Sequence, residues 1–479
     1  MKSTSLSSIL LIAAVFLTPA VSGSPAPELR NTVRIKLLET LSPKEAAMTA
    51  GQYGIAIYKS GQSRPEFQIG PGAAFRVVRR GNSVQLEAAA GRVNAPDIRL
   101  EPLGPGEIQI EAQSVRRSYA GSLWISAPAS ELTLEIINHV PLEEYVASVV
   151  SSEYGLSDLE GSKAMAVAAR TYGLRSLLGS GARFDHVDHT GSQVYKGTLT
   201  VTPLARQAAH ATAGQVLTYN DRLIEAVYSS SSGGHTANNE DVWQSSPYPY
   251  LRGKRDPWDS LSPNHSWEVS IKTDELHRAL ENALRLNLEH VEVAEQGSDG
   301  RVIAIGLNPK RGRTHTIAAD EFRRIIRSSL GEMRLKSTRF DLDKKRGRYV
   351  FTGSGFGHGV GLSQYGAHGM ALAGKSYTEI LHFYYSGVLL EQRQIEGSAP
   401  PPAGLLVPSA VPVPQVRSGS VDRLAGRYMP GRRVSRGTQP APVPATTATA
   451  PPTARRERPT GTRTRTVTKP ASNTARRGW

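Results

Sequence analysis

One stretch decides the fold of this chain: residues 140–155, which read VPLEEYVASVVSSEYG. Its apolar residues recur every three or four positions, at Leu142, Val146, Val149 and Val150. That spacing places them on one face of a helix. Pro141 suits the first position of a helix, the acidic pair after it suits the positive helix start, and Gly155 favours a stop. We therefore predict a helix from Pro141 to Gly155 that buries one apolar face.

A second helix is expected directly after the first. Ser157, with Glu160 three residues later, has the pattern of a capping box, and the small residues of the AMAVAAR run at 164–170 allow close contact with a neighbour. The same periodicity predicts further helices at 273–286, 319–330 and 378–385, and strand-like segments at 290–294 and 302–307.

Upstream, residues 33–139 alternate apolar and polar residues in short runs separated by Gly and Pro, which is typical of strands. The sequence therefore predicts an α+β chain. We expect a β-rich N-terminal region over 23–139, a mixed helix and sheet catalytic domain over 140–398, and a disordered C-terminal tail over 399–479.

The first residues have the composition of a secretory signal peptide. Lys2 precedes an apolar run over 9–17, and small residues follow Pro19 up to Gly23. The run is shorter than the roughly 20 residues that cross a bilayer. We expect residues 1–22 to be removed and the protein to be exported, to the cell wall, the periplasm or the extracellular space. An uncleaved anchor is the alternative.

The tail is rich in Pro, Ala, Thr and Arg and has too few apolar residues to offset the entropy of ordering. From residue 401 it holds 14 Lys and Arg against two acidic residues, so it supplies +12 of the formal net charge of +15. Attachment to anionic envelope polymers is one interpretation of this charge, and a solvated spacer is the other. Export argues against a nucleic-acid partner.

The sequence contains no cysteine, which excludes disulfides, thiol catalysis, a lipid-anchoring cysteine and any thiolate metal site. An exported protein without disulfides must be stabilised by core burial. A chain of 479 residues is long enough for that.

Four clusters between residues 140 and 388 carry the chemistry. They are the segment 140–172, DHTGSQVYKG at 188–197, YSSSSGGHT at 228–236 and GFGHGVGLSQYGA at 355–367. Their glycines let backbone amides approach a ligand, and their Ser, Gln, Tyr and His side chains offer uncharged hydrogen bonds. This inventory suits sugar hydroxyls and amides better than phosphates, and the fourth cluster lacks the ending of a Walker loop. Taken singly, each cluster is also explained as a tight turn with structural glycines.

Taken together and in order, the clusters resemble the family of stage II sporulation protein D and the amidase enhancer LytB. The resemblance rests on VPLEEY at 140–145, AVAARTY at 166–172, SGG-x-T at 232–236 and GHGVGLSQYGA at 357–367. It implies a mixed α and β domain that acts on peptidoglycan. Sporulation members are lytic transglycosylases for glycan strands already stripped of their peptides, whereas LytB-type members are enhancers of an amidase.

The resemblance also implies the site residues. The family's catalytic acid corresponds to Glu153. The expected substrate-binding residues are Arg170, Tyr172, Gln193, Tyr195, Ser232, Gly233, Gly234, His358, Ser363, Gln364 and Tyr365. Position independently favours Glu153, because the negative end of a helix dipole and burial beside Val149 and Val150 both raise a carboxylate's pKa. Glu144 is the nearest competitor for this role.

Two features depart from the family pattern. Tyr154 stands where the family often has Met. Some members bind zinc near the segment that matches 188–193, but this chain has no cysteine there, and His186 and His189 alone are a weak metal signal. We expect no metal and no cofactor. Serine hydrolysis is not favoured either, because no Gly-x-Ser-x-Gly elbow frames the serines at 229–232.

The sequence thus predicts a peptidoglycan lytic transglycosylase that cuts peptide-stripped strands with a single glutamate. Ordinary glycosidases pair two carboxylates. A transglycosylase manages with one because the C6 hydroxyl of muramic acid attacks in place of water. The rival hypothesis is a non-catalytic, glycan-binding enhancer of a cell-wall amidase, in which Glu153 is one more hydrogen-bonding residue. Expected partners are peptidoglycan strands, a cell-wall amidase and anionic envelope polymers.

Overall fold

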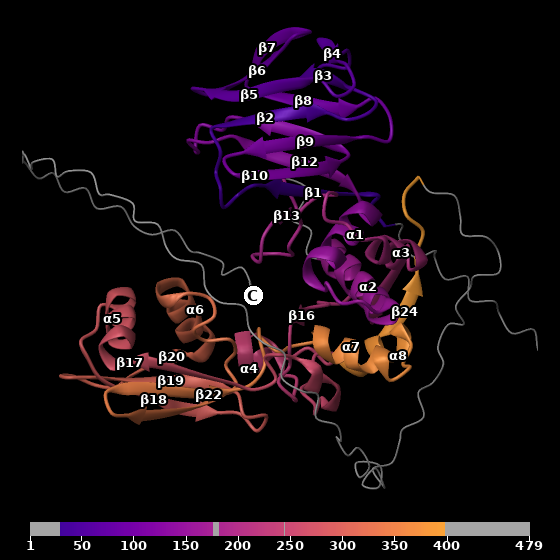
Figure 1. Cartoon of the computed structure of the whole chain (residues 1–479). Helices are drawn as coiled ribbons and strands as arrows, with labels where there is room; N and C mark the ends of the chain where they lie inside the picture. The colour runs from indigo at the N-terminus through magenta and orange to yellow at the C-terminus, as the bar shows by residue number, and fades with distance from the viewer. Residues whose placement is uncertain (1–28, 176–181, 244, 398–479) are drawn as a thin grey trace, which may run out of the picture. The chain divides into compact units, whose positions relative to one another are not determined.

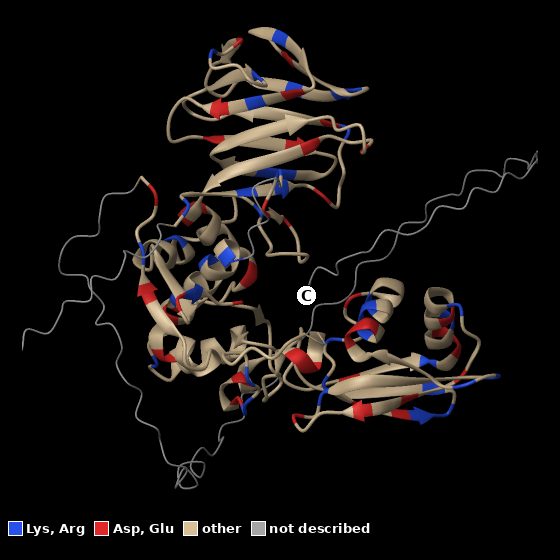
Figure 2. Cartoon of the chain, turned by 180° about the vertical axis from the view of Figure 1, so that it is seen from behind, with Lys and Arg blue, Asp and Glu red and all other residues tan. Residues whose placement is uncertain are grey.

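The computed structural model describes residues 29–175, 182–243 and 245–397 (Figure 1). The predicted signal peptide over 1–22 and the predicted tail over 399–479 lie outside the described residues. Within the described residues, no helix is long and apolar enough to cross a membrane. Basic and acidic residues are interspersed along the strands and helices in the view of Figure 2.

The β-rich N-terminal region consists of two sheets that bury their inner faces in one core (Figure 1). A seven-stranded sheet has the order β13-β1-β12-β11-β8-β3-β4. Its strands are β1 (Thr32–Leu37), β3 (Ile55–Lys59), β4 (Phe67–Ile69), β8 (Asp97–Pro102), β11 (Ser122–Ser126), β12 (Glu135–Pro141) and β13 (His186–Val187). A six-stranded sheet has the order β10-β9-β2-β5-β6-β7. Its strands are β2 (Glu45–Ala50), β5 (Ala74–Arg80), β6 (Ser83–Ala88), β7 (Gly91–Ala95), β9 (Glu107–Ala112) and β10 (Val115–Ala120).

Alternation of side chains explains why these segments form strands with one buried face. In β1 and β9, every second residue is buried and the residues between are partly or fully exposed. All neighbouring strands are antiparallel except β1 and β13, which are parallel. The predicted β-rich region is confirmed.

Helices form the body that follows the sandwich. They are α1 (Leu142–Glu153), α2 (Leu159–Arg175), α3 (Pro203–Ala211), α7 (Gln364–Leu372) and α8 (Tyr377–Tyr384). Strand β12 leads directly into α1, and α2 contacts α1, α3, α7 and α8. The residues of α2 from Ala164 to Ala169 are completely buried, as close contact by small side chains requires.

The ends of the first two helices differ in detail from the prediction. Pro141 is the N-cap of α1 and not its first helical residue, because it still pairs with Thr32 in the sheet. The predicted capping box of Ser157 is wrong. Asp158 precedes α2, and its Oδ1 accepts a 2.6 Å hydrogen bond from the amide of Gly161. Gly155 follows α1 with a φ of +57°, which favours glycine and confirms the predicted stop.

Short pairings bring distant clusters together. The strands β16 (Tyr228–Ser229) and β23 (Leu362–Ser363) pair in parallel, so the third and fourth sequence clusters lie side by side. Strand β14 (Gln215–Tyr219) lies between β15 (Arg222–Leu223) and β24 (Leu389–Gln392). A short helix α4 (Asn239–Trp243) and a single 3-10 turn η1 (Pro257–Leu261) complete this body.

Residues 267–353 build a second hydrophobic cluster of their own, between the third and fourth sequence clusters. Its elements are β17 (Trp267–Lys272), α5 (Thr273–Leu284), β18 (Leu288–Gln296), β19 (Val302–Pro309), β20 (His315–Ala318), α6 (Ala319–Leu330), β21 (Phe340–Lys345) and β22 (Arg348–Gly353). Figure 1 shows α5 and α6 on the same side of the strands. The predicted helices and strands of this stretch are found, but the region predicted as one domain over 140–398 holds two hydrophobic clusters.

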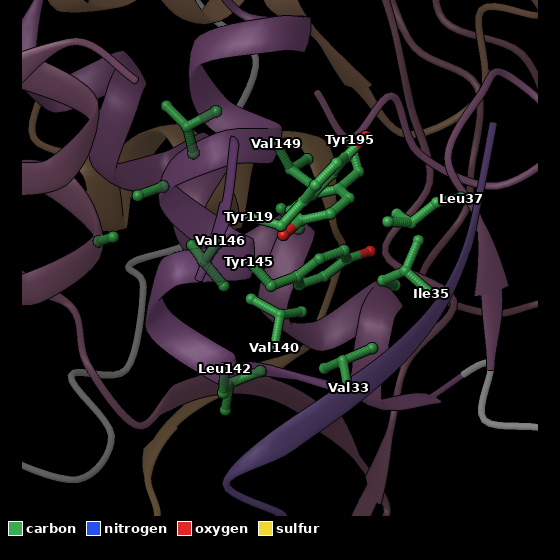
Figure 3. Close-up of a cluster of buried hydrophobic side chains, with 14 of the residues drawn as sticks. Val33, Ile35, Leu37, Tyr119, Val140, Leu142, Tyr145, Val146, Val149 and Tyr195 are labelled. Carbon is green, nitrogen blue, oxygen red and sulfur yellow. The ribbon is translucent and has the colours of Figure 1, made fainter. Parts of the chain in front are cut away.

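One continuous core joins the sandwich to the helices and fixes the position of α1. Tyr119 of β10, Tyr145 of α1 and Tyr195 lie ring against ring, with centroids of neighbouring rings 5.7 and 5.9 Å apart. Aliphatic side chains of β1 and α1 surround the three rings (Figure 3). The helix that carries Glu153 is therefore held on a rigid support.

Candidate active site

The carboxylate of Glu153 lies at the last position of α1, facing the segment that follows β13. Its Oε1 accepts a 2.7 Å hydrogen bond from the backbone amide of Val194. The amide of Tyr154 still bonds to the carbonyl of Val150, so the helix is regular up to this point. The Glu153 side chain is half-buried, which leaves it reachable by a ligand.

Burial raises the pKa of Glu153 to about 7. The Val194 amide, Lys196 and the Gln364 side chain lower the pKa in that order, but burial outweighs them. Of these groups only the exposed Lys196 carries a charge, so within the described residues no second carboxylate is among the groups that set this pKa. A carboxyl group with a pKa near 7 can donate a proton at neutral pH and take one back.

A buried row of hydrogen bonds runs beside Glu153. The hydroxyl of Tyr145 donates to Oε1 of Gln193 at 2.5 Å, and Nε2 of Gln193 donates to the hydroxyl of Tyr228 at 2.8 Å. Burial, and to a smaller extent the charge of Glu153, raises the pKa of both tyrosines, so both stay protonated. Both the oxygen and the nitrogen of the Gln193 side-chain amide are therefore hydrogen-bonded within the protein. It fixes the neighbouring residue Val194, whose amide holds Glu153.

Gln364 reaches Glu153 from the fourth sequence cluster. It is the first residue of α7, and its side chain is close enough to Glu153 to lower the pKa of that carboxyl. Only 5% of Gln364 is exposed, yet its Nε2 has no partner with hydrogen-bond geometry among the described residues. The interaction with Glu153 that lowers the pKa is therefore not a well-formed hydrogen bond, and an oxygen atom of a ligand would be a better partner for this donor.

Asp158 connects the two helices that carry Glu153 and Gln364. Its Oδ2 accepts a 2.9 Å hydrogen bond from the hydroxyl of Tyr154 and lies 2.6 Å from Nδ1 of His368. Tyr154 follows Glu153 directly, and His368 lies one turn after Gln364 on α7. Asp158 therefore fixes the spacing between the carboxylate and the free amide.

The serines and glycines of the third cluster surround a buried carboxylate instead of a ligand. Asp259 is completely buried in η1. It accepts hydrogen bonds from the hydroxyls of Ser231 and Ser363, both at 2.7 Å, and from the amides of Ser232 and Gly233 at 2.9 and 3.0 Å. A buried carboxylate needs this number of donors to remain stable. By accepting hydrogen bonds from residues of both, Asp259 holds the third and fourth sequence clusters together.

A second buried carboxylate, Asp256, completes this arrangement. It accepts from the hydroxyl of Ser232 at 2.8 Å and from that of Tyr384 at 3.0 Å. Burial raises the pKa of Asp256 to about 6. Because the Ser232 hydroxyl points to Asp256, it is not available as a nucleophile or as a sugar ligand.

Two arginines of the 267–353 segment hold the same loop from the other side. Arg301 is completely buried and donates to the carbonyls of Ser232 and His235 at 2.9 and 3.2 Å. Arg339 donates to the carbonyl of Gly233 at 2.7 Å. Gly359 lies against the guanidinium of Arg301, where a Cβ atom would come within 2.0 Å of it. This glycine is therefore required by packing.

Comparison with known proteins gives matches to about half of this chain. Stage II sporulation protein D of Bacillus amyloliquefaciens is 34% identical over 287 residues, which cover 55% of this chain and 78% of that protein. This chain belongs to the stage II sporulation protein D family. The protein of the same name from Bacillus subtilis (strain 168) is 33% identical over 287 residues, covering 56% of this chain and 79% of that protein.

The matched segments correspond to the structural units. The sequence profile described as Stage II sporulation protein matches residues 130–219, which include α1, α2, α3 and β14. A profile described as a domain of unknown function (DUF8618) matches residues 259–361, which enclose the second hydrophobic cluster. The amidase enhancer of Bacillus subtilis (strain 168) is 32% identical over 278 residues, covering 48% of this chain and 38% of that protein.

Several of the residues expected to bind substrate have their polar groups hydrogen-bonded inside the protein. The polar groups of Ser232, Gly233 and Ser363 are buried and donate hydrogen bonds to Asp256 and Asp259, so they are occupied within the protein. A loop rich in Ser and Gly resembles a ligand cradle, but here it surrounds the protein's own carboxylates, Asp256 and Asp259.

Arg170 and Tyr195 are likewise part of the core. Arg170 is completely buried, and its guanidinium forms a bidentate ion pair with Glu143 at 3.0 and 2.5 Å. The hydroxyl of Tyr195 donates to Oδ1 of Asn138 at 2.8 Å. Both side chains are buried and bonded within the protein, and their contact with substrate stays a prediction.

His358 of the fourth cluster is also buried. Its Nδ1 accepts from the amide of Val360 at 3.1 Å, and its ring lies 5.0 Å from that of Trp243. Burial lowers the pKa of His358 to about 3, so it is neutral. It shapes the loop and does not reach Glu153 through any contact described above.

Tyr172, Gly234 and Tyr365 remain candidates for contact with substrate because they are partly exposed. Tyr172 influences the pKa of Tyr145 and Tyr228, which places it beside the hydrogen-bonded row. Gln364 stays a candidate because its Nε2 is free.

The residues near the second cluster do not fit a zinc ion. His186 Nε2 is 2.7 Å from the carbonyl of Gly173, and His189 Nε2 is 2.6 Å from the carboxylate of Glu39. Across the described residues, no three His, Cys, Asp or Glu side chains are grouped as metal ligands.

Four groups that act on Glu153 or organise the site were not found from the sequence: the Val194 amide, Lys196, Tyr228 and Asp259. No sequence pattern marks Val194 or Lys196, because a backbone amide and an exposed lysine look the same in any loop. A sequence pattern does mark Asp259. It belongs to the segment DPWD at 256–259, in which two carboxylates flank a Pro-Trp pair beside the serine cluster.

Proposed function

We propose that this protein is a peptidoglycan lytic transglycosylase that cleaves peptide-stripped glycan strands with Glu153 as its acid and base. The observation that carries the proposal is the half-buried Glu153 carboxyl with a pKa of about 7, held by the Val194 backbone amide and influenced by the Gln364 side chain, whose Nε2 makes no well-formed hydrogen bond within the described residues. The similarity to an amidase enhancer supports a role at the cell wall in general.

The proposed reaction has two proton transfers. The protonated Glu153 donates its proton to the glycosidic oxygen, and the bond from that oxygen to C1 of muramic acid breaks. The positive charge that develops at C1 is then quenched by the C6 hydroxyl of the same sugar, whose oxygen bonds to C1 while Glu153 takes its proton. A 1,6-anhydro end forms, no water is consumed, and Glu153 regains its acid form.

The surroundings of Glu153 suit both steps. Burial keeps the acid protonated before the first transfer, while Lys196 and the Val194 amide stabilise the carboxylate after it. The scheme needs no second carboxylate, in contrast to glycosidases that activate a water. Gln364 would donate its free Nε2 to a sugar or acetamido oxygen and so align the strand.

Incubation of the purified full chain with soluble peptide-free glycan strands tests the proposal. The expected products are shorter strands with 1,6-anhydro ends, identified by mass spectrometry at 18 Da below the hydrolysed species. Products with free reducing ends would instead indicate hydrolysis, and strands still carrying peptides should be cut poorly. Absence of any cleavage would rule out the lytic transglycosylase function.

The second candidate function is a non-catalytic enhancer of a cell-wall amidase, favoured by the similarity to the amidase enhancer. In this alternative Glu153 serves binding alone. A purified cell-wall amidase should then release peptides faster when the full chain is added. The Glu153→Gln variant separates the two functions, because an enhancer would keep its effect without the acid.

We further propose that the protein is exported and acts in the envelope. The signal-peptide composition of residues 1–22 and the net charge of +12 over residues 401–479 support this. The basic tail would bind anionic envelope polymers and keep the active site near its substrate.

A further inference from the structure

A pocket lies on the outward face of the six-stranded sheet, and we call it the polar pocket. Thr49 of β2, Gln109 of β9 and Ser118 of β10 are register partners in a row across three neighbouring strands. The residues next to them, such as Met48 and Tyr119, belong to the core. Because side chains alternate along a strand, the three polar side chains point outward. The pocket that they line has a volume of about 420 Å³, which is within the range of pockets that hold small ligands.

Close backbone contacts fix the walls of the polar pocket. A Cβ atom at Gly51 would come within 2.2 Å of the carbonyl oxygen of Glu107, so the absence of a side chain lets the end of β2 lie directly against the start of β9. At Ser118, the backbone carbonyl accepts a 2.7 Å hydrogen bond from the amide of Thr198. Gly197 lies against the same carbonyl, and Ser118 is left only 5% exposed. The pocket is therefore a fixed feature of the sandwich.

The polar side chains of this pocket have no partners inside the described part of the protein. They belong to Thr49, Gln52, Glu107, Gln109 and Ser118. None of these side chains makes a hydrogen bond or an ion pair with another described residue. Ser118 is the unusual member, because a polar side chain of a buried residue normally has a partner. Polar groups that converge on one cavity without bonding to each other are typical of a site whose ligand supplies the partners.

The charge of the polar pocket indicates which sugar it fits. Glu107 is acidic, and no lysine, arginine or histidine is among the described residues that line the pocket. A carboxylate or phosphate would be repelled by Glu107 and would find no cation. Hydroxyl and amide groups, in contrast, can both donate to and accept from Thr, Ser and Gln side chains. In a peptide-free glycan strand the muramic acid units carry a carboxylate and the N-acetylglucosamine units do not, so the pocket fits N-acetylglucosamine.

We propose that the polar pocket is a second glycan site, which binds an uncharged N-acetylglucosamine unit. The choice of glycan rests on the proposed function, while the pocket needs none of the chemistry of Glu153. One segment connects the two sites, because the amide of Val194 holds Glu153 and the amide of Thr198 holds the strand that carries Ser118. Val194 and Thr198 are at most about 14 Å apart, since four residues of extended chain span no more. A strand of several sugars can therefore occupy the pocket while another part of it lies at Glu153.

A fluorescent label beside the polar pocket tests this inference. The chain has no cysteine, so Leu103→Cys, at an exposed position two residues before Pro105 of the pocket, provides a single labelling site. Titration of the labelled full chain with tri-N-acetylglucosamine, which carries no carboxylate, should change the emission up to saturation. A label at Glu268→Cys, an exposed position of β17, should show no such change.

Substitutions inside the pocket should change the affinity that this label reports. Gln109→Val should weaken binding of the trimer about three- to tenfold, because the hydrogen bonds of one amide are lost. Gln68→Val is the matched control, since it makes the same change at an exposed position of β4 in the other sheet, and it should bind like the parent. Where Gln109→Val lowers the melting temperature, Thr49→Val removes only a hydroxyl, keeps the β-branched shape and carries the same test.

The outcomes separate this inference from the proposed function. No response of the Leu103→Cys label, or equal affinity of the Gln109→Val protein and its parent, overturns the pocket even if the chain cleaves glycan strands. A saturable response that depends on Gln109, in a protein that cleaves no strand, supports the pocket and counts against the proposed function alone. Tighter binding of tri-glucosamine, whose ammonium groups would pair with Glu107, would overturn the uncharged sugar as the ligand if Glu107→Gln removed that preference.

Discussion

The backbone amide of Val194 holds the carboxylate of Glu153 at 2.7 Å, although the two residues are 41 positions apart in the sequence. The amide is itself fixed, because the preceding residue Gln193 is bound at both ends by tyrosine hydroxyls. A carboxyl with a single fixed amide donor is oriented without being trapped in its charged form. Burial can therefore keep the pKa of Glu153 at about 7.

Replacing Glu153 by Gln should reduce the formation of 1,6-anhydro products about a hundredfold or more, because the amide has no proton to donate. Affinity for peptide-free strands should stay close to that of the parent. Glu144→Gln is the matched control, since Glu144 lies on the same helix but is paired with Arg206 at 2.6 Å. Muropeptide analysis measures the products. If the Glu153→Gln variant cleaved strands fully and the Glu144→Gln variant did not, Glu144 would be the catalytic acid.

The rate of cleavage should fall as the pH rises through about 7, where Glu153 loses its proton. Lys196→Ala removes a positive charge that lowers this pKa, so the fall should shift to higher pH. Lys272→Ala removes the same charge at an exposed position of β17 and is the control. It should leave the pH dependence of the cleavage rate unchanged. A pH–rate profile of the three proteins provides the measurement, and identical profiles would contradict the influence of Lys196 on Glu153.

The same pKa predicts an effect on stability. Because folding raises the pKa of Glu153 from 4.5 to about 7, the folded state favours the protonated form. This contribution is complete below pH 4.5 and is lost as the pH rises through 7. Glu153→Gln resembles the protonated form, so its free energy of unfolding should match the parent at pH 4 and exceed it at pH 8, by at most about 3 kcal/mol. Urea titrations at the two pH values test this, and an equal difference at both would count against a buried, protonated Glu153.

Gln364→Met should weaken binding of peptide-free strands while leaving the melting temperature nearly unchanged. Methionine has a similar volume, and the Nε2 that it removes has no partner among the described residues. The loss of the amide should also raise the pKa of Glu153, which Gln364 lowers. Calorimetric binding and thermal melting of the same sample are the two readouts. A large drop in melting temperature with unaltered affinity would make Gln364 a core residue.

Asp259→Asn should lower the free energy of unfolding by about 3 kcal/mol, because four donors lose a buried carboxylate. Ser363→Ala removes one of these donors and should cost about 1 kcal/mol. Asp341→Asn, at an exposed position of β21, changes the charge equally and should be neutral. Chemical denaturation gives the values. If Asp259→Asn were as stable as Asp341→Asn but bound glycan poorly, the serine cluster would be a ligand site after all.

Deletion of residues 401–479 should release the protein from isolated envelopes and leave its melting temperature unchanged. The attraction should also weaken with salt, because the Debye length falls from about 10 Å at 0.1 M to about 3 Å at 1 M. Sedimentation of envelopes at the two salt concentrations measures retention. Equal, salt-insensitive retention of the truncated and full chains would rule out adhesion by the tail.

The sequence by itself determined the main helices and strands and singled out Glu153 as the candidate acid. Apolar spacing and Gly155 placed a helix that ends at Glu153, and alternation placed the strands of the sandwich, because these signals act between residues a few positions apart. The order of four clusters determined the family. Composition alone also located the positive charge in the tail.

Only the tertiary structure decided which polar residues face a ligand and which face the protein. From sequence alone, Ser232, Ser363 and Arg170 are expected to contact sugar. In the fold, the two serine hydroxyls donate to Asp256 and Asp259, and Arg170 is paired with Glu143. Conversely, the backbone amide of Val194 holds Glu153, and the Nε2 of Gln364 makes no well-formed hydrogen bond within the described residues. The physical reason is that a hydrogen bond satisfies whichever partner the folded chain brings within reach. For these residues the partner lies 24 to 104 positions away, where no local pattern can specify it.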